Sequence, residues 1–131
     1  MASAPQQLLA RADALLSEAI AASSPQDLFL GAYVAALRGA GAMLAVSEGS
    51  RGARGRHTRN AWLRLAESAP ELAPWAEYFS AYSATRAAVE AGAARSMSSE
   101  EADRFFGEVG RFLHDVEGRL GAAIQLDQRA S

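Results

Sequence analysis

The stretch that decides the fold is SPQDLFLGAYVAALRGAGAMLAV, residues 24–46 of a 131-residue chain. After Asp27 it carries a single charged side chain, Arg38. A helix on a protein surface has an apolar stripe and a polar face, whereas this stretch is apolar or small on nearly every side. Ser24 is a suitable N-cap and Pro25 a suitable first helical residue. The stretch therefore predicts a central helix enclosed by its neighbours.

The two sides of this helix differ in the size of their side chains. At 100° per residue the large ones share one broad side: Phe29, Leu30, Tyr33, Val34, Leu37 and Leu44. The small ones share the other: Ala32, Ala35, Ala36, Gly39 and Ala42. Because the distance between packed helices depends on the side chains at their contact, we expect another helix to come close on the small side.

Apolar residues at helical spacing predict further helices before and after the central one. They cover residues 6–22, a short helix that begins at Thr58 or Arg59, and longer helices over 75–91 and 99–124. Between Pro70 and Pro74 the sequence predicts a tight turn or a single helical turn. No strand-like alternation of useful length occurs in the sequence. The fold class is therefore all-α: a bundle of four main helices plus one short helix, forming one domain over residues 1–131.

Local signals refine the second half of this bundle. Ser98 and Glu101 have the spacing of a capping box, with Met97 placed to pack against Ala102. The glycine-rich segment 47–58 predicts a flexible loop, and the polar residues 125–131 predict a frayed tail.

Composition excludes several classes of chemistry. The chain has no cysteine, which excludes disulfides, thiolate catalysis and cysteine metal sites. All 13 basic residues are arginine, so a P-loop lysine and Schiff-base catalysis are excluded, and the alanine, glycine and arginine content suggests a GC-rich genome. No histidine or carboxylate cluster has metal-ligand spacing, so we expect neither a metal nor a cofactor.

The chain shows no sign of export or membrane insertion. Its first residues, MASAPQQLLA, lack the basic and apolar regions of a signal peptide. No stretch of 18 or more apolar residues is free of polar interruption. We therefore expect a cytoplasmic protein that has no membrane partner.

The main functional signal is a cluster of arginines after the central helix. Arg51, Arg54, Arg56 and Arg59 lie within nine residues, with His57 among them. The formal net charge is only −2, so any contact with nucleic acid must come from such a local patch. Arginine binds phosphate through two hydrogen bonds, and Arg-Gly segments can follow a single-stranded backbone. The cluster predicts binding of RNA or another polyanion; the alternative is a solvated loop in an arginine-biased proteome.

The helical pattern over residues 6–123, this basic loop and the run AWLRLAESAPELAPWAEYFSAYSATRAAVEAG resemble the HEPN domain family (higher eukaryotes and prokaryotes nucleotide-binding), in particular small single-domain HEPN proteins of high-GC bacteria. Many members cut RNA with an arginine and a histidine that are four to six residues apart and meet across a dimer. The resemblance implies a homodimer and makes Arg51 and His57 a candidate catalytic pair of a metal-independent ribonuclease. His57 would be the general acid or base, and Arg51 would stabilise the phosphorane.

In active members the pair sits later in the domain, in or entering a helix, so we expect binding rather than catalysis. A protein-interaction module, whose apolar and glycine faces bind a partner helix, is a second hypothesis, and the ribonuclease is a third. The glycine face lies opposite the phenylalanines of helix 99–124 and contains His114 with Gly107, Gly110, Gly118 and Gly121. Because each interior glycine costs about 1 kcal/mol relative to alanine, this stripe indicates either a closely packed helix or drift on a solvent face.

Overall fold

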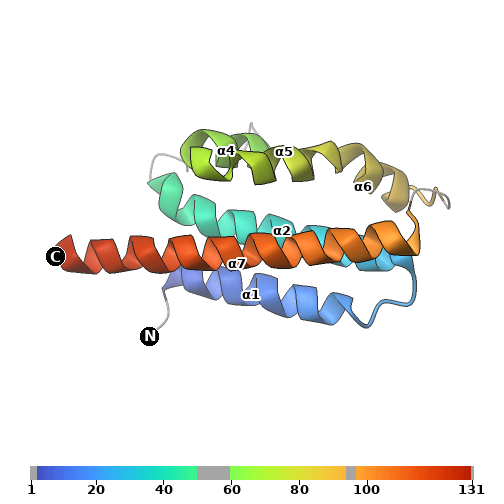
Figure 1. Ribbon diagram of the computed structural model, residues 1–131, viewed down its shortest axis with the longest axis horizontal. Coiled ribbons are helices and arrows are strands. Elements are labelled where there is room, and N and C mark those ends of the chain that lie inside the picture. Colours follow the sequence, from blue (N-terminus) through green and yellow to red (C-terminus); the bar gives the residue numbers. More distant parts are fainter. Residues whose placement is uncertain (1–2, 50–59, 94–96, 131) are drawn as a thin grey trace.

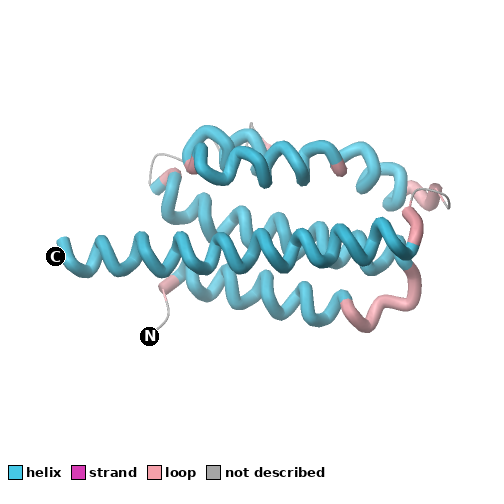
Figure 2. Tube along the Cα trace, viewed as in Figure 1, coloured by secondary structure: helices cyan, strands magenta, loops and turns pink. Residues whose placement is uncertain are grey.

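The computed structural model describes residues 3–49, 60–93 and 97–130, without the side chains of residues 124 and 127–130. Helices account for all the regular structure in these ranges (Figure 2). They are α1 (Ala4–Ala19), α2 (Pro25–Ser47), α4 (Ala61–Ser68), the 3₁₀ turn η2 (Pro70–Leu72), α5 (Ala73–Ala81), α6 (Ser83–Glu90) and α7 (Ser99–Ala130). The all-α helical bundle is confirmed.

The helices form two groups around α2 (Figure 1). α1, α2 and α7 run alongside one another, and each contacts the other two. α4, α5 and α6 follow one another along the opposite side, where α4 and α6 contact α2. The central helix predicted from residues 24–46 is therefore confirmed, and four other helices enclose it.

Local hydrogen bonds explain where the first two helices begin. The N-cap Ser24 accepts a hydrogen bond at Oγ from the backbone N–H of Asp27, at 3.1 Å. The predicted helix 6–22 is wrong at both ends, because α1 runs from Ala4 to Ala19. Ser3 and Gln6 form a reciprocal capping box that starts it earlier, with backbone-to-side-chain distances of 3.2 and 3.0 Å.

The predicted helix 75–91 is two helices in the structure. α5 ends at Ala81, Tyr82 has φ −89° and ψ 1°, and α6 begins at Ser83. The Tyr82 ring packs against Phe105 and Phe29, with centroid distances of 4.8 and 5.7 Å. The break lets the chain turn along α2 while this ring remains on the core, a tertiary effect that helical periodicity does not encode.

α7 begins as predicted and ends later. Ser98 accepts a hydrogen bond at Oγ from the backbone N–H of Glu101, at 3.1 Å, and both Met97 and Ala102 are buried. The backbone stays helical to Ala130, so the last turns of α7 occupy most of the predicted tail 125–131. These turns extend an existing helix with residues of good helix propensity, which needs no new nucleation.

Aromatic rings fill the core between the two groups of helices. Phe105 on α7 lies 4.7 Å from Phe29 on α2 and 5.8 Å from Phe79 on α5, measured between ring centroids. Of the phenylalanines of α7, Phe105 and Phe112 are buried and Phe106 is partly buried against the core. Trp62 and Tyr33 belong to the same core and are 4% and 3% exposed. The Trp62 indole N–H donates to the Tyr33 hydroxyl at 3.0 Å, which satisfies both polar ends inside the core.

The small side of α2 receives α7, as the sequence predicted. Its four alanines and Gly39 are all buried. A Cβ atom at Gly39 would overlap Cδ2 of Leu113, a side chain that is only 2% exposed. Gly39 therefore sets how closely α2 and α7 approach.

By length and composition, α2 could span a membrane, although the sequence analysis expected no such stretch. Its length and a mean hydropathy of 1.6 over an 18-residue window meet that criterion. In the bundle, 56% of this window is buried, and the helix contacts α1, α4, α6 and α7. Burial among these neighbours accounts for the apolar composition.

Two glycines of α2 test the close approach directly. Gly39→Ala should be less stable than Gly41→Ala by about 1–3 kcal/mol, since the new methyl group must displace Leu113 at residue 39 and meets nothing within 4 Å at residue 41. Both variants gain the same helix propensity, so their difference isolates packing. Urea unfolding of the two variants measures it; equal stabilities would contradict the close packing.

Candidate functional site

The predicted site residues all lie outside the described part of the chain. Arg51, Arg54, Arg56, Arg59 and His57 fall within residues 50–59. The structure therefore leaves the predicted nucleic-acid-binding residues and the candidate catalytic pair untested. It does describe the residues on either side, at the end of α2 and the start of α4.

An ion pair joins these two helix ends. Nε and Nη2 of Arg64 donate to the two carboxylate oxygens of Glu48, at 3.0 and 2.6 Å. The side chains are only 12% and 15% exposed, and the hydrogen bond to Glu48 raises the pKa of Arg64 against the opposing effect of burial. A contact of 2.7 Å between Ser47 Oγ and Ser68 Oγ lies beside the pair. The end of α2 and the body of α4 are thus held together.

The ends of the predicted loop 47–58 need correction. Ser47 is the last residue of α2. α4 begins at Ala61, not at Thr58 or Arg59, because Asn60 is its N-cap and accepts a hydrogen bond at Oδ1 from the Leu63 N–H, at 2.9 Å. Asn60, a favoured N-cap residue, is the signal in the sequence that marks this start.

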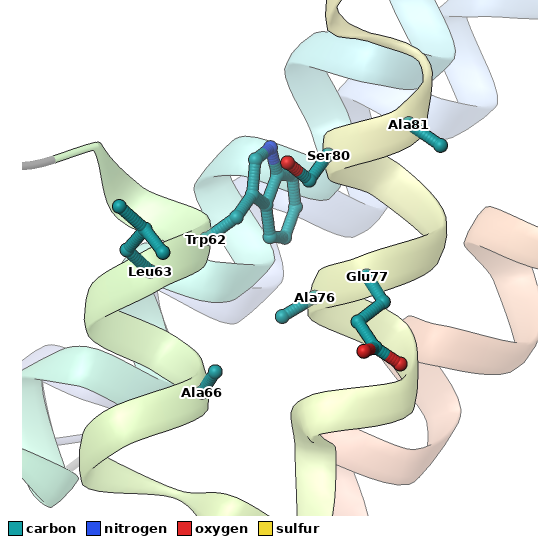
Figure 3. Close-up of a pocket in the computed structure, with 7 residues that line it drawn as sticks. All are labelled: Trp62, Leu63, Ala66, Ala76, Glu77, Ser80 and Ala81. Carbon is teal, nitrogen blue, oxygen red and sulfur yellow. The ribbon is translucent and has the colours of Figure 1, made fainter.

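A groove of about 380 Å³ runs between α4 and α5 (Figure 3). Mainly apolar and small side chains line it, together with one carboxylate and one hydroxyl group: Trp62, Leu63, Ala66, Ala76, Glu77, Ser80 and Ala81. Leu63 is 54% exposed, a large fraction for a leucine side chain. The groove has the chemistry of a contact surface for an apolar group and lacks a nucleophile paired with a base.

A smaller pocket of about 290 Å³ lies between α2, α4 and α6. The guanidinium carbon of Arg86 lies 4.9 Å from the centroid of the Tyr33 ring, and Arg86 Nε is 3.5 Å from the Glu90 carboxylate. Asn60 and Ser83 add polar groups to its lining. One lining residue, Asn60, directly follows Arg59, the last residue of the arginine cluster.

Two other arginines of the described bundle, Arg111 and Arg119, face carboxylates. Arg119 Nε donates to Asp115 at 3.0 Å, and Arg111 donates to Glu108. Asp115 also accepts from the indole N–H of Trp75 at 3.1 Å, which ties α7 to α5. These arginines neutralise acids of the bundle itself.

Two further pKa shifts have structural causes. Burial, followed by the neighbouring Tyr82, raises the pKa of Tyr78. Partial burial, followed by repulsion from Glu117, raises the pKa of Asp13. Neither group lines the groove or the smaller pocket.

No group of three histidine, aspartate or glutamate side chains in the described ranges could hold a metal ion. The described histidine, His114, is 88% exposed, with Nδ1 3.9 Å from Glu117.

Comparison with known proteins identifies the family. A model of the SAV_6107-like HEPN family matches residues 19–117, well over half of the chain. The chain belongs to the HEPN family. No curated protein and no solved structure matches it.

HEPN membership confirms the resemblance and agrees with the helical bundle. The match runs from the end of α1 into α7, so it includes the arginine cluster, the α4–α5 groove and the Arg86 pocket. Membership leaves open which of these sites acts, because the match reports a family rather than a residue's role.

The structure explains part of the glycine stripe in this HEPN chain. A Cβ atom at Gly107, Gly118 or Gly121 would meet nothing within 4 Å, and one at Gly110 would make ordinary contact with Leu16 at 3.9 Å. Close packing against a helix of the same bundle is therefore wrong for Gly107, Gly118 and Gly121, and packing by a second subunit is untested. Gly107, Gly118 and Gly121 face open space beside α7.

Replacing glycines of this face should stabilise the monomer. Gly107→Ala and Gly118→Ala should each raise the free energy of unfolding by up to about 1 kcal/mol, because alanine favours helix and has room here. Thermal unfolding of both single variants and the double variant measures the gain. A loss of stability that depends on protein concentration would instead indicate that a second subunit packs on the stripe.

Proposed function

We propose that this HEPN protein is a non-catalytic module that binds RNA or a similar polyanion through Arg51, Arg54, Arg56 and Arg59. The observation that carries the proposal is the separation of charge along the chain. Residues 50–59 contain four arginines and no acid. The rest of the chain has nine arginines against all 15 acids, a formal net charge of −6.

The acidic bundle favours a binding site confined to this segment. A polyanion that approached the bundle would meet a net negative charge, whereas the cluster offers four guanidinium groups within nine residues. Arg64, Arg111 and Arg119 are already engaged by carboxylates and are poor candidates for phosphate contacts. The Glu48–Arg64 pair joins α2, which precedes the cluster in the chain, to α4, which follows it.

Salt dependence tests this proposal. If all four arginines contact phosphates, the logarithm of the association constant for a short single-stranded RNA should fall with the logarithm of salt concentration with a slope of about −3. Replacing the four arginines by glutamine should abolish binding, measured by fluorescence anisotropy. The matched control replaces Arg11, Arg38 and Arg104, which are exposed on the bundle, and should bind like the original protein. No binding at low salt, or a flat salt response, would refute the proposal.

The same RNA reports on the alternative catalytic role. A ribonuclease that uses Arg51 and His57 would cut the RNA without added metal and would lose this activity in His57→Ala. Equal cleavage by both proteins would indicate a contaminating nuclease. Binding without cleavage supports the non-catalytic module.

The groove between α4 and α5 favours a second candidate function, a homodimerisation module. In a two-fold symmetric contact the same patch packs against itself, so it must contain both a protrusion and a hollow. Leu63 supplies an exposed apolar side chain, and the groove that it lines supplies a hollow bordered by Trp62, Glu77 and several small residues (Figure 3). Both features lie on one face.

This dimer predicts a specific effect of charge. Ala66→Glu would place a carboxylate in the groove opposite Leu63 of the second copy, so it should convert a dimer to a monomer in sedimentation experiments. Ala84→Glu, on the exposed side of α6, is the matched control and should leave the mass unchanged. A monomeric original protein, or a dimer that tolerates Ala66→Glu, would exclude this interface.

A further inference from the structure

We propose that the pocket between α2, α4 and α6 binds a single nucleobase, stacked on the guanidinium group of Arg86. The inference rests on the proposed function in one respect: the RNA whose phosphates meet the arginine cluster supplies the base. The pocket itself consists only of described residues, with Tyr33, Asn60, Ser83, Arg86 and Glu90 as its polar lining.

Arg86 is both held in place and accessible. Its guanidinium carbon lies 4.9 Å from the centroid of the Tyr33 ring, and 33% of its side chain is exposed. Tyr33 cannot easily move, because its hydroxyl accepts from the Trp62 indole at 3.0 Å and donates to the Phe79 carbonyl oxygen at 3.5 Å. A planar guanidinium group supported by a fixed aromatic ring offers a flat, preorganised surface on which a base can stack.

The rim of the pocket can read the edge of a base. The Asn60 side chain uses Oδ1 to cap α4, which leaves its amide N–H groups to donate. Ser83 is exposed and adds a hydroxyl group that donates and accepts, and the Glu90 carboxylate accepts. The edges of nucleobases carry donors and acceptors at short spacing, so this mixed set suits them.

Size and charge favour a base over a phosphate or a larger ligand. Pockets for drug-sized ligands span roughly 300–1,000 Å³, and this pocket of about 290 Å³ falls at or below the lower limit. Glu90 would repel a phosphate group at the rim. Asn60 directly follows Arg59 in the chain, so a strand whose phosphates lie on the arginine cluster can place a base here. Cationic contacts with the backbone combined with stacked bases are the usual mode of single-strand binding.

Abasic RNA separates the pocket from the cluster. The original protein should bind an RNA oligonucleotide about tenfold more tightly than the same oligonucleotide with abasic positions, because one stacked base is lost. Arg86→Lys keeps the positive charge but loses the planar surface, so it should abolish this preference without changing the salt slope. Asn60→Ser keeps an N-cap residue and should reduce the preference. Arg104→Lys, on the exposed surface of α7, should retain it.

The failures of the two proposals are distinguishable. Equal binding of normal and abasic RNA, or a preference that survives Arg86→Lys, would overturn the proposal that a base binds at Arg86. Neither result would contradict phosphate binding by the arginine cluster. If neither RNA binds, the proposed function is wrong, and titration with a free nucleoside decides the pocket. A shift of the Trp62 indole N–H resonance that is absent in Arg86→Lys would support it, and no shift would overturn it.

Discussion

The enclosure of α2 is the constraint on which the rest of the bundle depends. Its alanine side and Gly39 allow α7 to approach until Leu113 fills the space that a side chain at residue 39 would occupy. The other side carries Phe29 and Tyr33 into the ring cluster with Phe105. α7 therefore contacts α2 twice, closely at Gly39 and through Phe105 at the rings, and α4 meets the same rings through Trp62.

Most of the fold was predictable because its main determinants are local. Ser24 and Ser98 cap helices through backbone groups only three residues away in the sequence. The buried faces of α2 and α7 follow helical spacing. The break at Tyr82 was not predictable, because it depends on where Phe29 and Phe105 lie in space. The start of α1 was missed although Ser3 and Gln6 carry a visible capping signal.

Glycines show why composition alone cannot reveal packing. Gly31 and Gly39 lie where a Cβ atom would press against Ala19 and Leu113, whereas Gly107 and Gly118 face open space. All four are interior helix glycines, and the stripe on α7 was the more conspicuous pattern in the sequence. The difference arises from which helix faces each glycine, and spacing along one helix carries no information about the opposite surface. For the candidate site the limit is similar: sequence identified the arginine cluster, but the pocket at Arg86 joins residues from α2, α4 and α6.

Two ion pairs of different strength lie near the junction of α2 and α4. Glu48, the nearest acid that precedes the arginine cluster, directs both carboxylate oxygens to Arg64, which follows the cluster. This pair strengthens the junction and at the same time engages an acid that lies close in sequence to the four arginines. The one ionic contact of the adjoining pocket, between Arg86 and Glu90, is longer at 3.5 Å and partly exposed, so a stacked base could share this arginine without breaking a buried pair. A strong internal pair thus closes the junction, and a weaker one beside it leaves an arginine available to a ligand.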